Sequence, residues 1–150
     1  MLIAKNRKAL FNYEIVEKFL AGIELKGYEV KALREKKVNF EGAYISLLEG
    51  VPHLVNLHIG RYSNQSQEYN EQEARRPRKL LLLKPEIHKL QREISEKGKT
   101  AVPLAILLKN NIIKIELAVV KGKKKHQKKV LLKARQQKED LEKQFKEKRF

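Results

Sequence analysis

The sequence predicts a mainly β fold: a small antiparallel barrel with two or three short helices and a basic C-terminal tail. Apolar runs of strand length recur along the first 120 of the 150 residues, and turn residues separate them. The last 30 residues instead hold thirteen Lys and Arg against four Asp and Glu. Because so charged a segment buries too little apolar area to fold alone, we divide the chain into a body, residues 1–120, and a tail, residues 121–150, that is disordered in isolation.

Three segments of the body carry helix signals. Apolar side chains spaced as on one helix face predict a helix over Tyr13–Ala21, which Gly22 would end. A strand over Ile23–Gly27 follows, and then a short helix with a basic outer face over Lys31–Lys37. The clearest pattern predicts a helix over Pro85–Lys97, because proline suits a first helical turn.

Two hairpins organise the predicted strands. In chain order, the strands and their turns are Gly42–Leu48, the turn Glu49-Gly50 and Val51–Ile59, then Ala101–Leu108, the turn Lys109-Asn110-Asn111 and Ile112–Val120. A short strand over Lys79–Leu83 lies between them, and Gly60–Arg75 is predicted to be a polar surface loop. Alternation along the last strand points one set of side chains the same way, namely Ile113, Ile115, Leu117 and Val119. Since helices and strands do not alternate, a parallel sheet is not expected, and a small barrel of the OB class, which commonly binds oligonucleotides, fits best.

The charge indicates a polyanionic partner. The formal net charge is +16 and the isoelectric point is about 10.0, which favours either nucleic acid or an anionic membrane surface. No apolar run approaches the roughly 20 residues that span a bilayer, and the N-terminus lacks the apolar stretch of a secretory signal. There is no Cys, so disulfides, thiol nucleophiles and thiolate metal sites are excluded. We therefore expect a cytoplasmic protein that binds nucleic acid and not a membrane.

The sequence offers no catalytic constellation. Nucleotide-binding glycine motifs and metalloprotease motifs are missing, and the four His residues are scattered among separate segments. His53 and His58, five residues apart on one predicted strand, would face opposite sides. The one Asp, Asp140, lies in the tail. We expect no enzyme activity, no metal and no cofactor; an RNA-processing enzyme, the alternative, lacks candidate catalytic residues.

Four basic clusters are the candidate contacts for RNA. They are Lys5/Arg7/Lys8, Lys31/Arg34/Lys36/Lys37, Arg75/Arg76/Arg78/Lys79 and Lys121/Lys123/Lys124/Lys125/Lys128/Lys129. Each cluster alone is compatible with ordinary solvated surface charge. Their joint occurrence on a β-rich body favours RNA binding, and the arginine cluster is the most informative because guanidinium groups grip phosphate bidentately and stack on unpaired bases.

Four strings in order give the chain a specific resemblance. They are Asn6-Arg7-Lys8-Ala9, the stretch Ala21–Lys31, Arg76–Leu82 and Val120-Lys121-Gly122-Lys123-Lys124. With these strings the sequence resembles the SsrA-binding protein family, also called small protein B (SmpB), from Asn6 to about Lys133. The resemblance implies an OB-like body that binds the tRNA-like domain of transfer-messenger RNA. It also implies delivery of that RNA to stalled ribosomes for trans-translation, which means ribosome rescue and peptide tagging.

The partners are likewise implied by the resemblance. The direct partners are transfer-messenger RNA and the stalled ribosome. The contact with the ribosome is through small-subunit rRNA. Elongation factor Tu and alanyl-tRNA synthetase act indirectly through the RNA, and the protein is expected to be a monomer. The family tail is disordered in solution and becomes helical in the empty mRNA channel at the decoding centre.

The resemblance and the basic clusters together assign the site residues. For RNA binding they are Asn6, Arg7, Lys8, Glu29, Lys31, Arg34, Arg76, Arg78, Lys79, Lys121, Gly122, Lys123 and Lys124. For the ribosomal decoding centre they are His126, Lys128, Lys129, Lys133 and Arg135. Glu29 is expected at the RNA-facing surface, where it accepts from base or 2′-OH donors or orients its basic neighbours. His126 is expected to stack on an rRNA base, whereas Leu131–Arg135 lacks the acidic residues of typical family tails.

One different function stays open at this point. A generic ribosome-associated OB-fold RNA-binding protein would share the basic body but would not deliver transfer-messenger RNA. The tail separates the two hypotheses, because a generic binder needs no hinge followed by a helix-capable extension.

Overall fold

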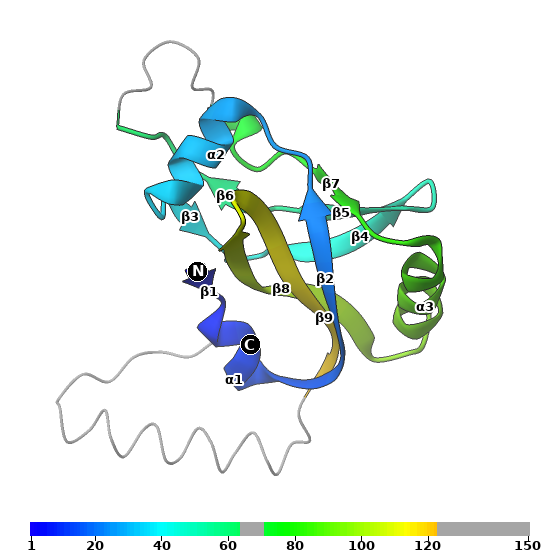
Figure 1. Ribbon diagram of the computed structural model, residues 1–150. Coiled ribbons are helices and arrows are strands. Elements are labelled where there is room, and N and C mark those ends of the chain that lie inside the picture. Colours follow the sequence, from blue (N-terminus) through cyan, green and yellow to red (C-terminus); the bar gives the residue numbers. More distant parts are fainter. Residues whose placement is uncertain (64–70, 123–150) are drawn as a thin grey trace, which may run out of the picture.

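The computed structural model describes residues 1–63 and 71–122, and these form a mainly antiparallel β structure with three α-helices (Figure 1). Seven strands make one sheet in the order β1-β8-β9-β2-β7-β5-β4. Their bounds are Leu2–Lys5 (β1), Tyr13–Ile23 (β2), Tyr44–Leu48 (β4), Val51–Val55 (β5), Arg78–Leu81 (β7), Lys99–Lys109 (β8) and Ile112–Gly122 (β9). A small second sheet pairs β3, Val38–Asn39, with β6, His58–Ile59. The helices are Arg7–Asn12 (α1), Gly27–Arg34 (α2) and Lys84–Ile94 (α3), with a 3₁₀ turn η1 over Glu71–Glu73.

The large sheet curls without closing. Its two edges are β1 and β4, and the described residues form no ladder between these edges. The curl nevertheless brings β4 against β8. All strand pairs are antiparallel, so the expected mainly β, OB-like architecture is confirmed as a half-closed barrel.

Both predicted hairpins are present, and the backbone conformation of their turn residues explains why the chain reverses at these points. Asn110 and Asn111 have positive φ angles of 51° and 64°, and Glu49 and Gly50 have 54° and 79°. Two successive left-handed residues form the turn whose twist matches that of paired strands, and Asn and Gly tolerate this conformation best. Local turn chemistry therefore fixes β4–β5 and β8–β9.

The helix predicted over Tyr13–Ala21 is wrong, since this segment is strand β2. Adjacent apolar pairs in the segment imitate a helical face. A bulge in the pairing with β9, between Ile15 and Glu17, accommodates Val16 as an extra residue. Beyond the bulge the strand alternates, with Phe19 buried and Leu20 exposed. Pairing with β9 along almost the whole strand overrides the local pattern.

Helix α2 begins four residues earlier than predicted and replaces the end of the strand expected over Ile23–Gly27. Its start is fixed by the Glu29 carboxylate, which accepts a hydrogen bond of 2.8 Å from the backbone N–H of Lys26. The helix ends before Lys36, whose φ of 61° cannot continue it. Helix α3 lies within the predicted Pro85–Lys97 apart from its first residue, Lys84.

From Leu117 to Val120, strand β9 is buried on both faces and so joins two apolar layers. Its odd-numbered residues Ile113, Ile115, Leu117 and Val119 enter the main core, as predicted. Ala118 and Val120 point the other way, into a smaller cluster with Ala9 of α1. Helix α1 thus covers the outer end of the β8–β9 ribbon, which fixes where its basic residues lie.

Candidate RNA interface

The structure separates the predicted RNA-binding residues into two groups at opposite ends of the body (Figure 1). Helix α2 carries Glu29, Lys31 and Arg34, and ion pairs join it to Arg76 and Arg78. At the other end α1 carries Arg7 and Lys8, and β9 ends beside it because Gly122 pairs with Tyr13, the residue after the helix. We refer to these groups as the α2 end and the α1 end.

A buried carboxylate organises the α2 end. Glu29 is only 2% exposed, and its Oε2 accepts from Arg78 Nε at 2.8 Å. Arg78 is 0% exposed and also donates to the backbone oxygens of Leu57, at 2.7 Å, and Ala74, at 2.9 Å. Each of these buried polar groups has a partner. Helix α2, strand β7 and the segments that contain Leu57 and Ala74 are therefore held together at one point.

Arg76 is the surface member of the same cluster. Its guanidinium donates to both Glu29 oxygens, with Nη2 to Oε1 at 2.5 Å and Nε to Oε2 at 3.2 Å. The Arg76 side chain remains 26% exposed. One carboxylate therefore holds two guanidinium groups, and the excess positive charge of the cluster is presented to solvent through Arg76.

The expected surface position of Glu29 is wrong, and Arg78, also predicted to bind RNA, is buried beside it. Glu29 lies in α2, and its oxygens are occupied by two arginines and a backbone amide. The structure gives both residues a positioning role, whereas Lys31, Arg34 and Lys79 are exposed as expected. The partners of Glu29 lie 47 and 49 residues away in the sequence, so no local pattern could have paired them.

Burial and hydrogen bonding act in opposite directions on Glu29. Burial alone would raise its pKa, but hydrogen bonds from Arg76, the Lys26 amide and Arg78 outweigh burial and hold the pKa of this carboxyl below its ordinary value. Glu29 is therefore charged at neutral pH, and the ion cluster is fully formed there.

Further contacts brace the solvent side of α2. The Lys31 ammonium lies 5.3 Å from the centre of the Tyr62 ring. Ser63 donates to Glu35 through both its hydroxyl, at 2.7 Å, and its backbone N–H, at 2.9 Å. Residues 62–63 are thus fastened to the helix, which leaves Arg34 and Lys31 on the same solvent-facing side.

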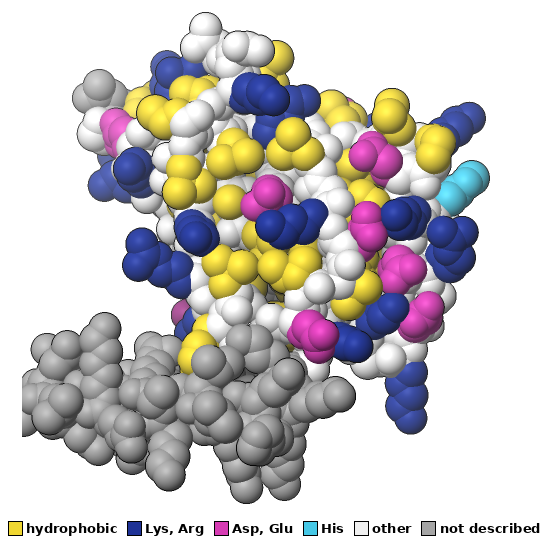
Figure 2. All heavy atoms as spheres, turned by 60° about the horizontal axis from the view of Figure 1, so that its bottom comes forward, with side chains coloured by type: hydrophobic (Ala, Val, Ile, Leu, Met, Phe, Trp, Pro, Cys, Tyr) yellow, Lys and Arg dark blue, Asp and Glu magenta, His cyan; other side chains and the backbone are white. Residues whose placement is uncertain are grey.

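An exposed apolar patch on the outer face of the sheet was missed by sequence reasoning. Leu20 of β2, Leu81 of β7 and Leu83 are 44%, 49% and 71% exposed. Gly22 pairs with both Leu81 and Lys114, which brings the patch next to cationic side chains. Figure 2 shows one face of the body on which hydrophobic side chains lie in the open among Lys and Arg. The signal was present in Lys79–Leu83, where alternation turns every second leucine outward.

Asn6 belongs to the framework of the α1 end. Its side-chain amide donates to Pro103 O at 2.8 Å, and its Oδ1 accepts from the backbone N–H of Ala9 at 3.2 Å. Its backbone N–H also donates to Leu104 O. At 9% exposure Asn6 caps α1 and ties it to β8. Of the predicted RNA-binding residues at this end, Arg7, Lys8, Lys121 and Gly122 are exposed.

The remaining predicted residues lie outside the described part of the chain. They are Lys123, Lys124, His126, Lys128, Lys129, Lys133 and Arg135. Strand β9 itself continues through Lys121 and Gly122, two residues past the boundary drawn from the charge pattern.

Other predicted features can be placed within residues 1–63 and 71–122. His53 lies on β5 and His58 on β6, so the two do not share a strand. Over the same ranges, no three His, Asp or Glu side chains come together where they could hold a metal ion. The helices described there are all too short or too polar to cross a membrane.

Comparison with known proteins places the whole arrangement in one family. The family model described as SmpB protein matches residues 3–147. The chain belongs to the SmpB family. SsrA-binding proteins from Nostoc punctiforme and Treponema denticola are 44% and 43% identical over 145 residues, which cover 97% of this chain and 93% of each relative. The SsrA-binding protein from Caldanaerobacter subterraneus is 45% identical over 149 residues, covering 99% of this chain and 93% of the relative.

A solved SmpB structure has the same fold. One chain from the structure named "tmRNA-SmpB: a journey to the center of the bacterial ribosome" is 38% identical and superimposes with a TM-score of 0.71. The match covers 88% of this chain and 95% of the other. The SmpB resemblance inferred from the four strings is thereby confirmed.

We predict that Glu29→Gln destabilises the body by about 3–5 kcal/mol, because the buried Arg78 guanidinium loses its counter-charge. Urea unfolding of the two proteins measures the difference. Glu73→Gln is the matched control, since its ion pair with Lys26 is about half exposed and is therefore screened by solvent. Equal losses in the two variants would contradict the structural role of the buried cluster.

The same carboxylate predicts a pH dependence. The folded-state pKa of Glu29 is lowered, so its stabilising contribution is present above the unfolded value of about 4.5 and is lost as pH falls through the folded pKa. Wild-type stability should therefore decline below about pH 4.5. The difference in unfolding free energy between wild type and Glu29→Gln should shrink over that range. A difference that stays constant from pH 7 to pH 3 would argue against an ionised Glu29.

Proposed function

We propose that this protein binds the tRNA-like domain of transfer-messenger RNA and delivers that RNA to stalled ribosomes for peptide tagging. The observation that carries the proposal is the SmpB family match over residues 3–147, together with two cationic ends on one rigid body. Relatives of this chain are named SsrA-binding proteins, and the similar solved structure is named for tmRNA and the ribosome.

The α2 end and the outer sheet face suit a folded RNA. Arg76 presents a guanidinium whose position is fixed by Glu29, and Lys31 and Arg34 add charge on the neighbouring helix. On the outer face, Lys79 and Leu81 project from the same side of β7. Such a surface can grip phosphates with its cations and place apolar atoms against ribose and base edges, as proteins do when they recognise RNA by shape.

The α1 end suits a second RNA. Arg7, Lys8 and Lys121 are exposed there, and the chain leaves the sheet at Gly122 beside them. We propose that residues from 121 onward form the basic tail and enter the decoding centre and empty mRNA channel. Lys123, Lys124, His126, Lys128, Lys129, Lys133 and Arg135 are then its candidate contacts with rRNA.

The other parts of the proposal follow from this assignment. The protein acts as a non-catalytic monomer in the cytoplasm. Elongation factor Tu and alanyl-tRNA synthetase act with it through the RNA, because transfer-messenger RNA must be alanylated and carried to the ribosome before tagging.

We predict a strong salt dependence for binding of the tRNA-like RNA. If the body neutralises about five phosphates, log K against log salt has a slope of roughly −3.5 to −4.5. Filter binding over a salt series measures this slope. Lys79→Gln should reduce its magnitude by about 0.7–0.9, whereas Lys97→Gln, an exposed lysine next to α3, should leave it unchanged. A wild-type slope near zero would rule out phosphate-driven binding.

We also predict that the body and the tail have separable activities. A chain that ends at Lys125 keeps every described residue, so it should bind the tRNA-like RNA about as tightly as the full chain. It should fail to support peptide tagging on stalled ribosomes in a reconstituted translation reaction. Loss of both activities would contradict separate roles. Tagging by the truncated chain would show that the tail is dispensable for delivery.

A further inference from the structure

The α2 end carries an exposed carboxylate among its cations. Glu73 belongs to the 3₁₀ turn η1, and its side chain remains 45% exposed. Its Oε1 accepts from Lys26 Nζ at 3.2 Å and from the Tyr28 hydroxyl at 3.2 Å. The Lys26 ammonium also lies 5.8 Å from the centre of the Tyr28 ring. These three surface side chains, each in contact with the other two, therefore form one unit.

Backbone hydrogen bonds fix this unit beside the buried ion cluster. The Lys26 N–H donates to Glu29, and the Arg76 N–H donates to Glu73 O at 3.1 Å. Glu73 and Arg76 therefore lie in one turn of the chain, three residues apart, and Arg76 is the surface cation of the cluster. An acidic side chain is thus built into the surface that we propose for the tRNA-like RNA, next to two of its cations.

Both members of the surface ion pair are charged at neutral pH. The hydrogen bond from Lys26 holds the pKa of Glu73 below its ordinary value, and the same hydrogen bond raises the pKa of Lys26. Within residues 1–63 and 71–122, no carboxylate forms an ion pair with Lys31 or Arg34. A phosphate can therefore approach Lys31 or Arg34 directly, whereas at Lys26 it has to replace a carboxylate and is repelled by it.

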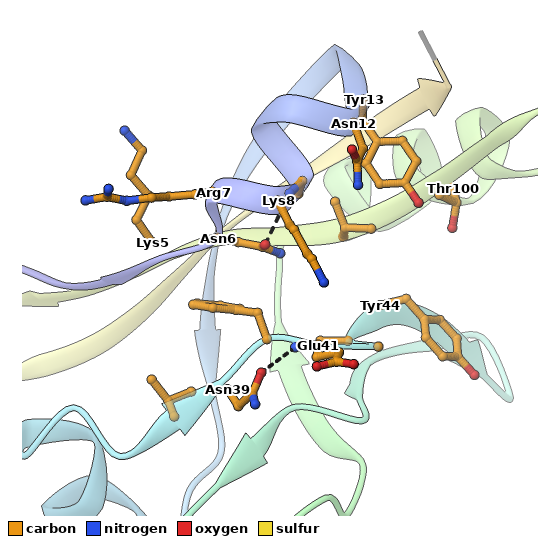
Figure 3. A pocket seen from close by; sticks show the side chains of 16 residues that line it. Lys5, Asn6, Arg7, Lys8, Asn12, Tyr13, Asn39, Glu41, Tyr44 and Thr100 are labelled. Atoms are coloured by element: carbon orange, nitrogen blue, oxygen red, sulfur yellow. Dashed lines mark hydrogen bonds between the residues drawn. The ribbon is translucent and has the colours of Figure 1, made fainter. Parts of the chain in front are cut away.

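Acid and base are arranged differently at the α1 end. A groove of about 630 Å³ lies there, and Glu41 is the single acidic residue among the described residues that line it. Figure 3 shows the Glu41 side chain across the groove from Lys8. In the described part of the chain, neither of these two residues takes part in an ion pair. A carboxylate that neutralises a surface lysine is therefore a feature of the α2 end and not of this groove.

We propose that Glu73 is a specificity-determining residue, which weakens the binding of unrelated RNA because it competes with phosphate for Lys26. A repulsive element gives selectivity when it disfavours the wrong partner more than the right one. RNA that binds through its phosphates alone has to break the Lys26–Glu73 pair and then lies against a free carboxylate. The identity of the right partner rests on the proposed function: the tRNA-like domain places its phosphates at Arg76, Lys31 and Arg34 and leaves the pair intact.

Binding of the full chain to two RNAs tests the proposal. One is the tRNA-like domain and the other is an unrelated RNA duplex of similar length, both measured by filter binding at the same salt concentrations. Glu73→Gln should bind the duplex roughly two- to fivefold more tightly, because a surface ion pair no longer has to be broken. The freed Lys26 adds about one phosphate contact, which should steepen the salt slope of the duplex by about 0.7–0.9. Affinity for the tRNA-like domain should change less, so the ratio of the two affinities should fall.

Glu17→Gln is the matched control for the change in charge. Glu17 pairs with Lys89 at 3.0 Å, and the side chains of this pair are 38% and 45% exposed, close to the 45% and 48% of Glu73 and Lys26. The control frees a lysine on α3, which lies apart from α2 in Figure 1, so it should leave the affinity ratio unchanged. A second variant, Lys26→Gln, should reduce the effect of Glu73→Gln on duplex binding, because the competition acts through Lys26.

Three results would overturn the proposal. They are equal tightening of both RNAs by Glu73→Gln, equal effects of Glu17→Gln and Glu73→Gln, and an effect of Glu73→Gln that persists unchanged in the Lys26→Gln background. Urea unfolding is measured for each variant, and a lower midpoint for Glu73→Gln than for Glu17→Gln would assign the effect to lost structure and count against the proposal.

Failure of the proposed function gives a different result. If the wild-type protein binds the tRNA-like domain no more tightly than the unrelated duplex, the proposed function is wrong. The dependence of duplex binding on Glu73 and Lys26 would still decide whether the carboxylate competes with phosphate.

Discussion

The carboxylate of Glu29 is the interaction on which the α2 end depends. It caps the helix through the Lys26 amide, fixes the buried Arg78, and through Arg78 ties in the carbonyls of Leu57 and Ala74. Moving the charges of Glu29 and Arg78 out of water is unfavourable unless their hydrogen bonds are satisfied. Here they are satisfied, and the remaining positive charge reaches solvent at Arg76. A structural ion cluster and a surface cation are thus one unit, and a change in the buried carboxylate alters the surface as well.

The long strands set the distance between the two ends. Strand β2 starts directly after α1 and ends four residues before α2 begins, and an eleven-residue strand extends for roughly 35 Å. It pairs with β9 for most of this length. Two candidate RNA contacts are therefore held at a fixed separation by a hydrogen-bonded ladder, and neither depends on a flexible linker. This rigidity is what a protein needs if it binds one RNA and presents it to another.

Local chemistry explains which parts of this arrangement could be predicted from sequence. Asn110-Asn111 and Glu49-Gly50 specify their hairpins by themselves, and Pro85 marks the first turn of α3. Strand β2 could not be predicted, because the extra residue Val16 at the bulge gives the apolar side chains a spacing like that of a helix. Only pairing with β9 makes the segment a strand. The candidate RNA interface likewise has a part that the sequence predicts and a part that it does not. The exposed cations could be predicted from the clusters of Lys and Arg in the sequence. The burial of Glu29, Arg78 and Asn6 depends on partners 47 to 97 residues away.

The position of β9 has a mechanical consequence. Its last residues, Lys121 and Gly122, are still paired with β2, and Lys121 is also paired with β8. A pull on the chain beyond Gly122 would therefore act along the strand and load the hydrogen bonds of two ladders together, in shear. A strand at the edge of the sheet, pulled sideways, would instead release its bonds one after another. The body is thus suited to resist tension applied to the chain at Gly122.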